Sequence, residues 1–221
     1  MESYWIIFIA LMVFSFIVQL MLESRFNKYS KVGIPLSGAE VSAKMLSDNG
    51  IDVKIQSVKG KLTDHYNPLD KTINLSENVY SMRSIAAAAV AAHETGHCLQ
   101  HAKGYLPLKL RSALVPVVTF SSSIVMWVLL AGVLFIGVFP HLIWIGIGLF
   151  AMTTLFAFIT LPVEIDASRR AIAWLRTSGL ADAQTLPMAQ DALKWAAYTY
   201  VIAALSSLAT LLYYIGIARS R

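Results

Sequence analysis

Four long apolar runs are the feature that most constrains how this chain can fold. The first, YWIIFIALMVFSFIVQLML, covers Tyr4–Leu22 without a charged residue. A helix of about 20 apolar residues spans the roughly 30 Å hydrocarbon core of a bilayer. Further runs cover Leu114–Val138, Leu142–Leu161 and, richer in Ala and Ser, Trp195–Ala218. We therefore predict a mainly α membrane protein with four transmembrane helices.

The composition agrees with contact to lipid. Only 14% of the 221 residues are charged, against about 25% in soluble domains. The first run is expected to remain as an anchor, because Glu2 precedes it and no small-residue cleavage motif follows. The single cysteine, Cys98, cannot form an intrachain disulfide and fits a reducing compartment.

The distribution of Lys and Arg beside the runs predicts the orientation. Basic residues follow the first run, precede the second and lie between the third and fourth, whereas Phe139–His141 has none. The positive-inside rule then places residues 23–113 and 162–194 in the cytoplasm. Arg219 and Arg221 depart from the rule, because they follow the fourth run on the outer side. The net charge of +5 is expected to reflect this topology and attraction to anionic headgroups, with no nucleic-acid partner.

These features predict five parts along the chain. They are a transmembrane anchor at 1–22, a cytoplasmic domain at 23–113, a transmembrane hairpin at 114–161, a cytoplasmic helical segment at 162–194 and a transmembrane helix at 195–218.

The polar segment between the first two runs predicts a small α+β domain. PLSGAEVSAKMLSDNGI is typical of a helix capped by Ser37. DVKIQSVKG alternates as a strand does, and KLTDHYNPLDKTINLS, with NPLD as its turn, predicts a hairpin. SMRSIAAAAVAAHETGHCLQHAKG predicts a helix of about twenty residues that begins at Ser81 or Ser84 and ends before Gly104.

The last of these helices carries the pattern HETGH at residues 93–97. His93 and His97 project from one face of the helix, so that their imidazoles can bind one Zn²⁺. Glu94 lies about 100° round the helix, beside the metal, where it can take a proton from the attacking water and pass it to a leaving amine. Gly96, on the opposite face, would let another element approach closely. The pattern predicts a hydrolase site with one zinc ion and Glu94 as catalytic base.

A catalytic zinc needs a third protein ligand, and Glu164 is the best candidate. Glu164 and Asp166 lie in TLPVEIDASRRAIAWL, at the end of the third run, where an ionisable group is costly without a partner or a role. The two acids are about 200° apart on a helix, so only one can face the metal. Asp166 stays open as the alternative ligand, and both acids could instead pair with Arg169 and Arg170. The acid that does not bind the metal is expected to orient a histidine ring.

Two further histidines are weaker candidates. His101 lies about 12 Å from His93 along the helix axis, too far for both to reach one ion. We expect His101 to contact a ligand residue or the substrate, or simply to be exposed. His65, in the predicted hairpin, could donate to a developing oxyanion or be an ordinary loop residue. The hairpin could also offer an edge strand to a peptide substrate.

AAHETGHCLQHA and LPVEIDASRRA, in a chain of this length with these runs, resemble the YugP-like neutral zinc metallopeptidases, which are bacterial membrane proteins. The likeness to HtpX-type membrane proteases and CAAX prenyl proteases is more distant. The resemblance implies a zincin-like, gluzincin-like HExxH domain in which His93, His97 and Glu164 bind zinc. The HtpX-type pattern has an Asp four residues after its Glu ligand, whereas this chain has Ser168 there. The role of Asp166 therefore stays open.

We accordingly predict a membrane-anchored zinc-dependent endopeptidase of the bacterial plasma (inner) membrane, with its active site facing the cytoplasm. Its partners would be the lipid bilayer and membrane-proximal or cytoplasmic protein or peptide substrates, with a homo-oligomer or a regulatory membrane partner left open. One alternative is a site-2-type intramembrane protease, which would take an Asp-Gly ligand that this chain lacks. Another is a non-catalytic zinc-bearing membrane adaptor or chaperone, which would not need Glu94.

Overall fold

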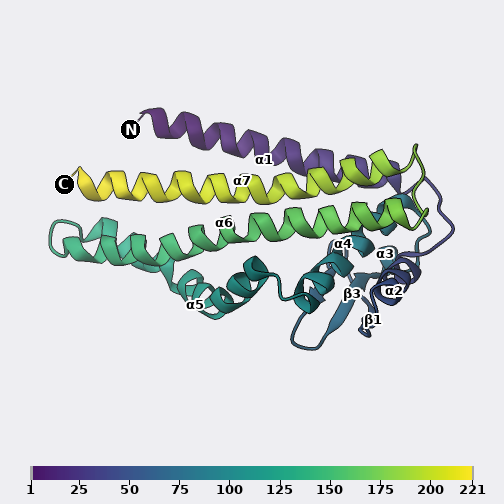
Figure 1. Cartoon of the computed structure of the whole chain (residues 1–221). Coiled ribbons are helices and arrows are strands. Elements are labelled where there is room, and N and C mark those ends of the chain that lie inside the picture. Colours follow the sequence, from purple (N-terminus) through teal and green to yellow (C-terminus); the bar gives the residue numbers. More distant parts are fainter. Residues whose placement is uncertain (1, 221) are drawn as a thin grey trace. The chain divides into compact units, whose positions relative to one another are not determined.

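The computed structural model describes residues 2–220 and is mainly helical, with one small sheet (Figure 1). The helices are α1 (Glu2–Tyr29), α2 (Gly38–Asp48), α3 (Glu77–Ser81), α4 (Ile85–Ala102), α5 (Leu106–Leu134), α6 (Pro140–Thr177) and α7 (Leu186–Arg219). The strands are β1 (Lys54–Val58), β2 (His65–Asn67) and β3 (Thr72–Ser76).

The chain divides into two compact units. The apolar unit comprises Met1–Ile17, Lys109–Pro162 and Thr199–Arg221. The motif unit comprises Val18–Leu108 and Val163–Tyr198 and contains the HETGH helix. Both units contain parts of the same four long helices, α1, α5, α6 and α7.

Four helices, α1, α5, α6 and α7, are long and apolar enough to cross a membrane, as predicted. All four extend at one end well beyond their predicted apolar runs. Helix α5 begins at Leu106 rather than near Leu114, and α6 continues through Pro162 to Thr177. The apolar runs therefore locate each helix but not its ends: intrahelical hydrogen bonds continue into more polar sequence, and α5 ends at Leu134, before the end of its run at Val138.

The apolar unit packs through close contacts between helices and exposes much apolar surface. A Cβ atom on Gly132 of α5 would lie 2.7 Å from the Cα atom of Ile143 of α6, so these two backbones touch. Large apolar side chains nevertheless face outward, among them Ile6 at 69% and Trp127 at 71% exposure. Apolar surface on this scale suits lipid rather than water.

The sheet of the motif unit has the strand order β1-β3-β2, which places β2 at an edge. β2 pairs antiparallel with β3, in the register Tyr66 opposite Ile73, and this confirms the predicted hairpin. β1 pairs parallel with β3, with Lys54 opposite Thr72. That parallel pairing and the short helix α3 were not predicted.

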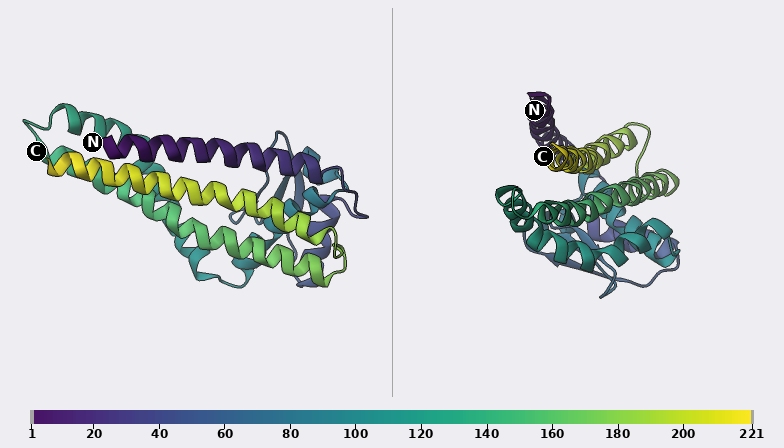
Figure 2. Two further views of the ribbon diagram at one scale, coloured as in Figure 1. Left: turned by 90° about the horizontal axis from the view of Figure 1, so that it is seen from above. Right: turned by 90° about the vertical axis from the view of Figure 1, so that its left-hand side faces the viewer.

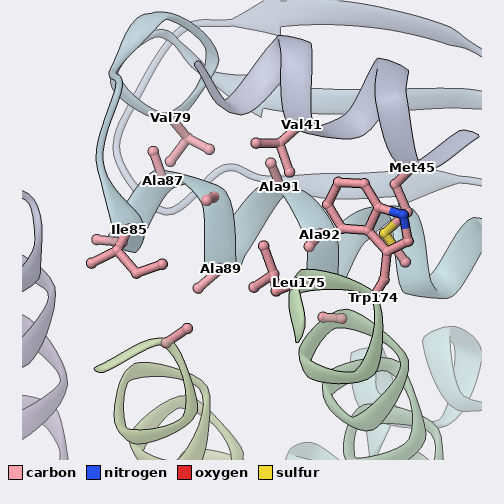
Figure 3. Close-up of a cluster of buried hydrophobic side chains, with 14 of the residues drawn as sticks. Val41, Met45, Val79, Ile85, Ala87, Ala89, Ala91, Ala92, Trp174 and Leu175 are labelled. Carbon is pink, nitrogen blue, oxygen red and sulfur yellow. The ribbon is translucent and has the colours of Figure 1, made fainter. Parts of the chain in front are cut away.

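Helix α4 forms the centre of the motif unit (Figure 3). Ala86–Ala89, Ala91 and Ala92 are fully buried, and their small side chains let other elements pack on several sides of the helix. The helix begins after Ser84, whose side chain accepts a hydrogen bond from the Ala87 N–H. Gly104 follows its end with a φ of 64°. Both ends thus agree with the sequence prediction.

Helices α4 and α6 come into backbone contact at Gly96. A Cβ atom there would lie 2.7 Å from the carbonyl oxygen of Ala167, a separation that real Cβ atoms do not tolerate. This confirms that Gly96 permits the close approach of another element, but the predicted face is wrong: Gly96 lies about 60° from His93 round the helix and meets α6, the helix that carries Glu164. Gly96 follows His93 by three residues and Ala167 follows Glu164 by three, so the contact sets the two functional positions opposite each other.

We expect Gly96→Ala to destabilise the protein even though alanine favours a helix by about 1 kcal/mol. The new methyl group would force α4 and α6 apart, and such overpacking typically costs about 1–3 kcal/mol. A net loss of about 1 kcal/mol lowers Tm by about 2–4 °C in thermal unfolding of the detergent-purified protein. Gly148→Ala is the control, because nothing lies within 4 Å of a Cβ atom there. Equal Tm values for the two variants would contradict the contact.

Candidate metal centre

The structure brings His93 and His97 of α4 together with Glu164 of α6. Oε2 of Glu164 lies 3.2 Å from Nε2 of His93 and 3.5 Å from Nε2 of His97. One ligand atom from each residue lies within 4.8 Å of the other two, so the three could hold a metal ion. His97 and Glu164 are buried, Glu164 being only 3% exposed, whereas His93 is partly exposed.

This donor set fits a zinc ion. Catalytic zinc commonly has three protein ligands, with bonds of about 2.0–2.2 Å from nitrogen and oxygen in a tetrahedral arrangement. Two ligand atoms on such a tetrahedron lie about 3.3–3.5 Å apart. The separations of 3.2 Å and 3.5 Å between Glu164 and the two imidazoles are close to this spacing.

The outer ring nitrogens of both histidines are engaged by polar side chains. Nδ1 of His93 lies 3.1 Å from Oγ of Ser168, and Nδ1 of His97 lies 3.0 Å from Oε1 of Gln100. A hydrogen bond at Nδ1 fixes the orientation of an imidazole and leaves Nε2 for a metal. Both Nε2 atoms accordingly point towards Glu164.

Gln100 determines which ring nitrogen of His97 carries the proton. Its amide nitrogen donates to the carbonyl oxygen of Val163 at 2.7 Å and to Oδ2 of Asp166 at 2.8 Å. The amide oxygen is therefore left to accept, so the bond from His97 is a donation from Nδ1. The neutral ring then presents its lone pair at Nε2, as a metal ligand must.

Asp166 lies outside the ligand cluster. It accepts hydrogen bonds from Gln100 and, at 2.6 Å, from Nε of Arg170. It thus contacts His97 only through Gln100, and its ion pair with Arg170 is one that the sequence analysis had left open. Sequence reasoning missed Gln100, although its place three residues after His97 on one helix was a usable signal. Ser168 occupies the position, four residues after Glu164, that the HtpX-type pattern fills with Asp.

Glu94 is also outside the cluster, and the edge strand of the sheet holds it. Its Oε2 atom accepts a hydrogen bond of 3.1 Å from the backbone N–H of Tyr66 in β2. The Tyr66 hydroxyl lies 2.8 Å from Nδ1 of His101, so His101 is linked to Glu94 through Tyr66. His65 is exposed and bonds the carbonyl oxygen of Thr63, which does not bring it into the cluster.

Burial and charge shift the ionisation of groups on α4 and β2. Burial acts to lower the pKa of His97, but the hydrogen bond with Glu164 and the charges of Glu94 and Glu164 outweigh it, so the pKa is raised. A metal ion at Nε2 must therefore compete with a proton. Burial raises the pKa of Cys98 to about 11 and that of Tyr66 to about 12, so both are neutral at pH 7.

Comparison with known proteins assigns the chain to a family. Residues 4–219 match the family described as "Putative neutral zinc metallopeptidase". The chain belongs to this family. It is also 42% identical over 212 residues to "Putative membrane protease YugP" of Bacillus subtilis (strain 168), an alignment that covers 95% of this chain and 93% of that protein. No solved structure matches the chain significantly.

The predicted resemblance to the YugP-like family is thus confirmed. A zinc metallopeptidase of this family is expected to use zinc, and the buried cluster on α4 and α6 supplies a group of ligands for it. The name of the relative and the four apolar helices together indicate that this chain is a membrane protein.

We expect Gln100→Leu to weaken zinc binding by about 10- to 100-fold, the usual effect of removing the partner of a ligand histidine. Leucine fills similar space, but it leaves Nδ1 of His97 without an acceptor and frees the ring to turn. The measurement is a zinc titration against a competing chelator on the detergent-purified protein. Gln184→Leu is the control, because Gln184 is exposed. Unchanged zinc affinity in a folded Gln100→Leu variant would rule out this role.

Proposed function

We propose that this metallopeptidase is a membrane-embedded endopeptidase in which His93, His97 and Glu164 hold one zinc ion. The observation that carries the proposal is the meeting of two Nε2 atoms and a buried carboxylate within 4.8 Å. Glu94, next to His93 in sequence but outside the cluster, is left free to act as general base.

The zinc ion and Glu94 would have different parts in the reaction. A zinc ion held by the three ligands would polarise the scissile carbonyl and lower the pKa of a coordinated water. Glu94 takes a proton from the water as its oxygen attacks the carbonyl carbon, and then gives that proton to the nitrogen of the leaving amine. The hydrogen bond from Tyr66 to Oε2 holds the carboxylate in place, so that Oε1 can accept the proton.

The edge strand β2 supports a mode of substrate binding. The N–H of Tyr66 donates to Glu94 and therefore points away from β3. An extended peptide beside this edge of β2 would lie next to Glu94. Because the Tyr66 N–H is already bonded to Glu94, the strand would hold the peptide through the outward carbonyl oxygen of Tyr66. With the motif unit on the cytoplasmic side, as the Lys and Arg distribution predicts, the substrates would be cytoplasmic or membrane-proximal proteins.

Three single substitutions test this mechanism on the detergent-purified chain. We expect the unmodified protein to bind about one zinc ion and to cleave casein or a membrane-derived peptide. Glu94→Gln should keep zinc but lose activity by about 10²- to 10⁴-fold, because it removes the general base. Glu164→Ala should lose zinc. Glu77→Gln, which changes an exposed acid at the start of α3, should alter neither property.

Removal of the metal is a second test of the mechanism. A chelator should abolish cleavage, and about one equivalent of zinc should restore it. Zinc retained by Glu164→Ala would show that the third ligand is another residue. Stable zinc binding without cleavage of any soluble or membrane peptide would instead favour a non-catalytic zinc-bearing adaptor.

A further inference from the structure

A groove of about 390 Å³ lies between the C-terminal part of α6 and the N-terminal part of α7, within the motif unit. These two segments lie side by side (Figure 2). The residues that line the groove recur at intervals of three and four along both helices, so one stripe of each helix faces it. The volume falls within the range of roughly 300–1,000 Å³ that is typical of sites for small ligands.

Three cationic side chains line the groove, and no carboxylate does. The cations are Arg169, Arg176 and Lys194. The acids nearest in sequence already form ion pairs with other residues: Asp166 pairs with Arg170, and Asp191 pairs with Arg25. Within residues 2–220, the ion pairs include none of the three groove cations. The groove therefore presents a net positive charge to an anion.

The rest of the lining is largely apolar and lies next to lipid-type sequence. Ile165, Ile172 and Leu193 contribute apolar side chains to the groove. Lys194 immediately precedes the apolar run that begins at Trp195. A soluble phosphate compound would use the cations but would leave these apolar side chains without a partner. A ligand with an anionic head and an apolar body would use both.

We propose that this groove binds the headgroup of an anionic glycerophospholipid. Basic pockets between membrane helices on the cytoplasmic side are suited to such headgroups, because arginine and lysine pair with phosphate oxygens while the acyl chains stay with apolar side chains. Arg169 and Arg176 are seven residues apart, about 10 Å along α6, so they can contact different parts of one headgroup.

Ser168 connects the groove with the metal centre. It lines the groove, and its Oγ atom lies 3.1 Å from Nδ1 of His93. The lipid site and the zinc site therefore share one side chain. Lipid binding can still be measured without any assay of peptidase activity.

The test is a lipid titration of the full chain in a neutral detergent, after removal of co-purified lipid, with bound lipid counted by native mass spectrometry. The probes are dioleoyl phosphatidylglycerol and dioleoyl phosphatidylcholine. The groove variant carries Arg169→Gln, Arg176→Gln and Lys194→Gln. The control variant carries Lys54→Gln, Lys59→Gln and Lys61→Gln, which remove the same charge from exposed positions outside the groove.

We expect the unmodified protein to bind phosphatidylglycerol at least about tenfold more tightly than phosphatidylcholine. Each basic residue near a headgroup contributes about fivefold in affinity, so the groove variant should lose on the order of 100-fold. The control variant should stay within about threefold of the unmodified protein. Circular dichroism and zinc content establish that both variants are folded.

Three results would overturn the proposal. The first is binding of phosphatidylglycerol by the folded groove variant at the unmodified level, and the second is equal binding of phosphatidylcholine. The third is displacement of the lipid by a competitor without acyl chains. Displacement by glycerol phosphate would assign the groove to soluble phosphates, and displacement by an oligoglutamate peptide would assign it to an acidic protein segment.

Discussion

The burial of Glu164 is the constraint on which the motif unit depends. A carboxylate that is 3% exposed has lost almost all of its hydration, and an isolated charge in that position would cost several kcal/mol. The neighbouring groups that can offset this cost are His93 and His97, or a cation placed between them and the carboxylate. Either solution requires α4 and α6 to be held together at this level. The fold therefore has to bring a HETGH helix and a distant acid into backbone contact.

Small residues make that contact possible. The buried alanines of α4 let α2, the sheet and α6 surround one helix (Figure 3). Gly96 leaves no side chain of its own between α4 and Ala167. Ser42 and Thr95 tie α2 to the same helix through a hydrogen bond of 3.0 Å between their hydroxyls. Rigid packing of this kind suits a site whose ligand atoms must stay within tenths of an ångström of their positions.

Local patterns in the sequence predicted every helix except the short α3, together with the hairpin and the caps, because each depends on residues a few positions apart. The pairing of β1 with β3 was not predictable, since the register of a parallel pair depends on packing between distant segments. The same reasoning explains the site. The spacing pointed to His93 and His97, and the cost of an acid beside an apolar run pointed to Glu164 or Asp166 as the third position. Gln100 acts through contacts with Val163 and Asp166 that only the packing of α6 on α4 creates.

Helix α6 carries two kinds of chemistry on neighbouring faces. Glu164 and Ala167 face α4, while Arg169 and Arg176 face the groove beside α7. Ser168 lies between them and belongs to both environments. A rotation of α6 about its axis that improved the contacts of the arginines would also move Ser168 relative to His93, because side chains on one rigid helix turn together. An anion that turned α6 would therefore also change the affinity of the cluster for a metal ion, in a direction set by whether the turn strengthens or weakens the contact between Ser168 and His93.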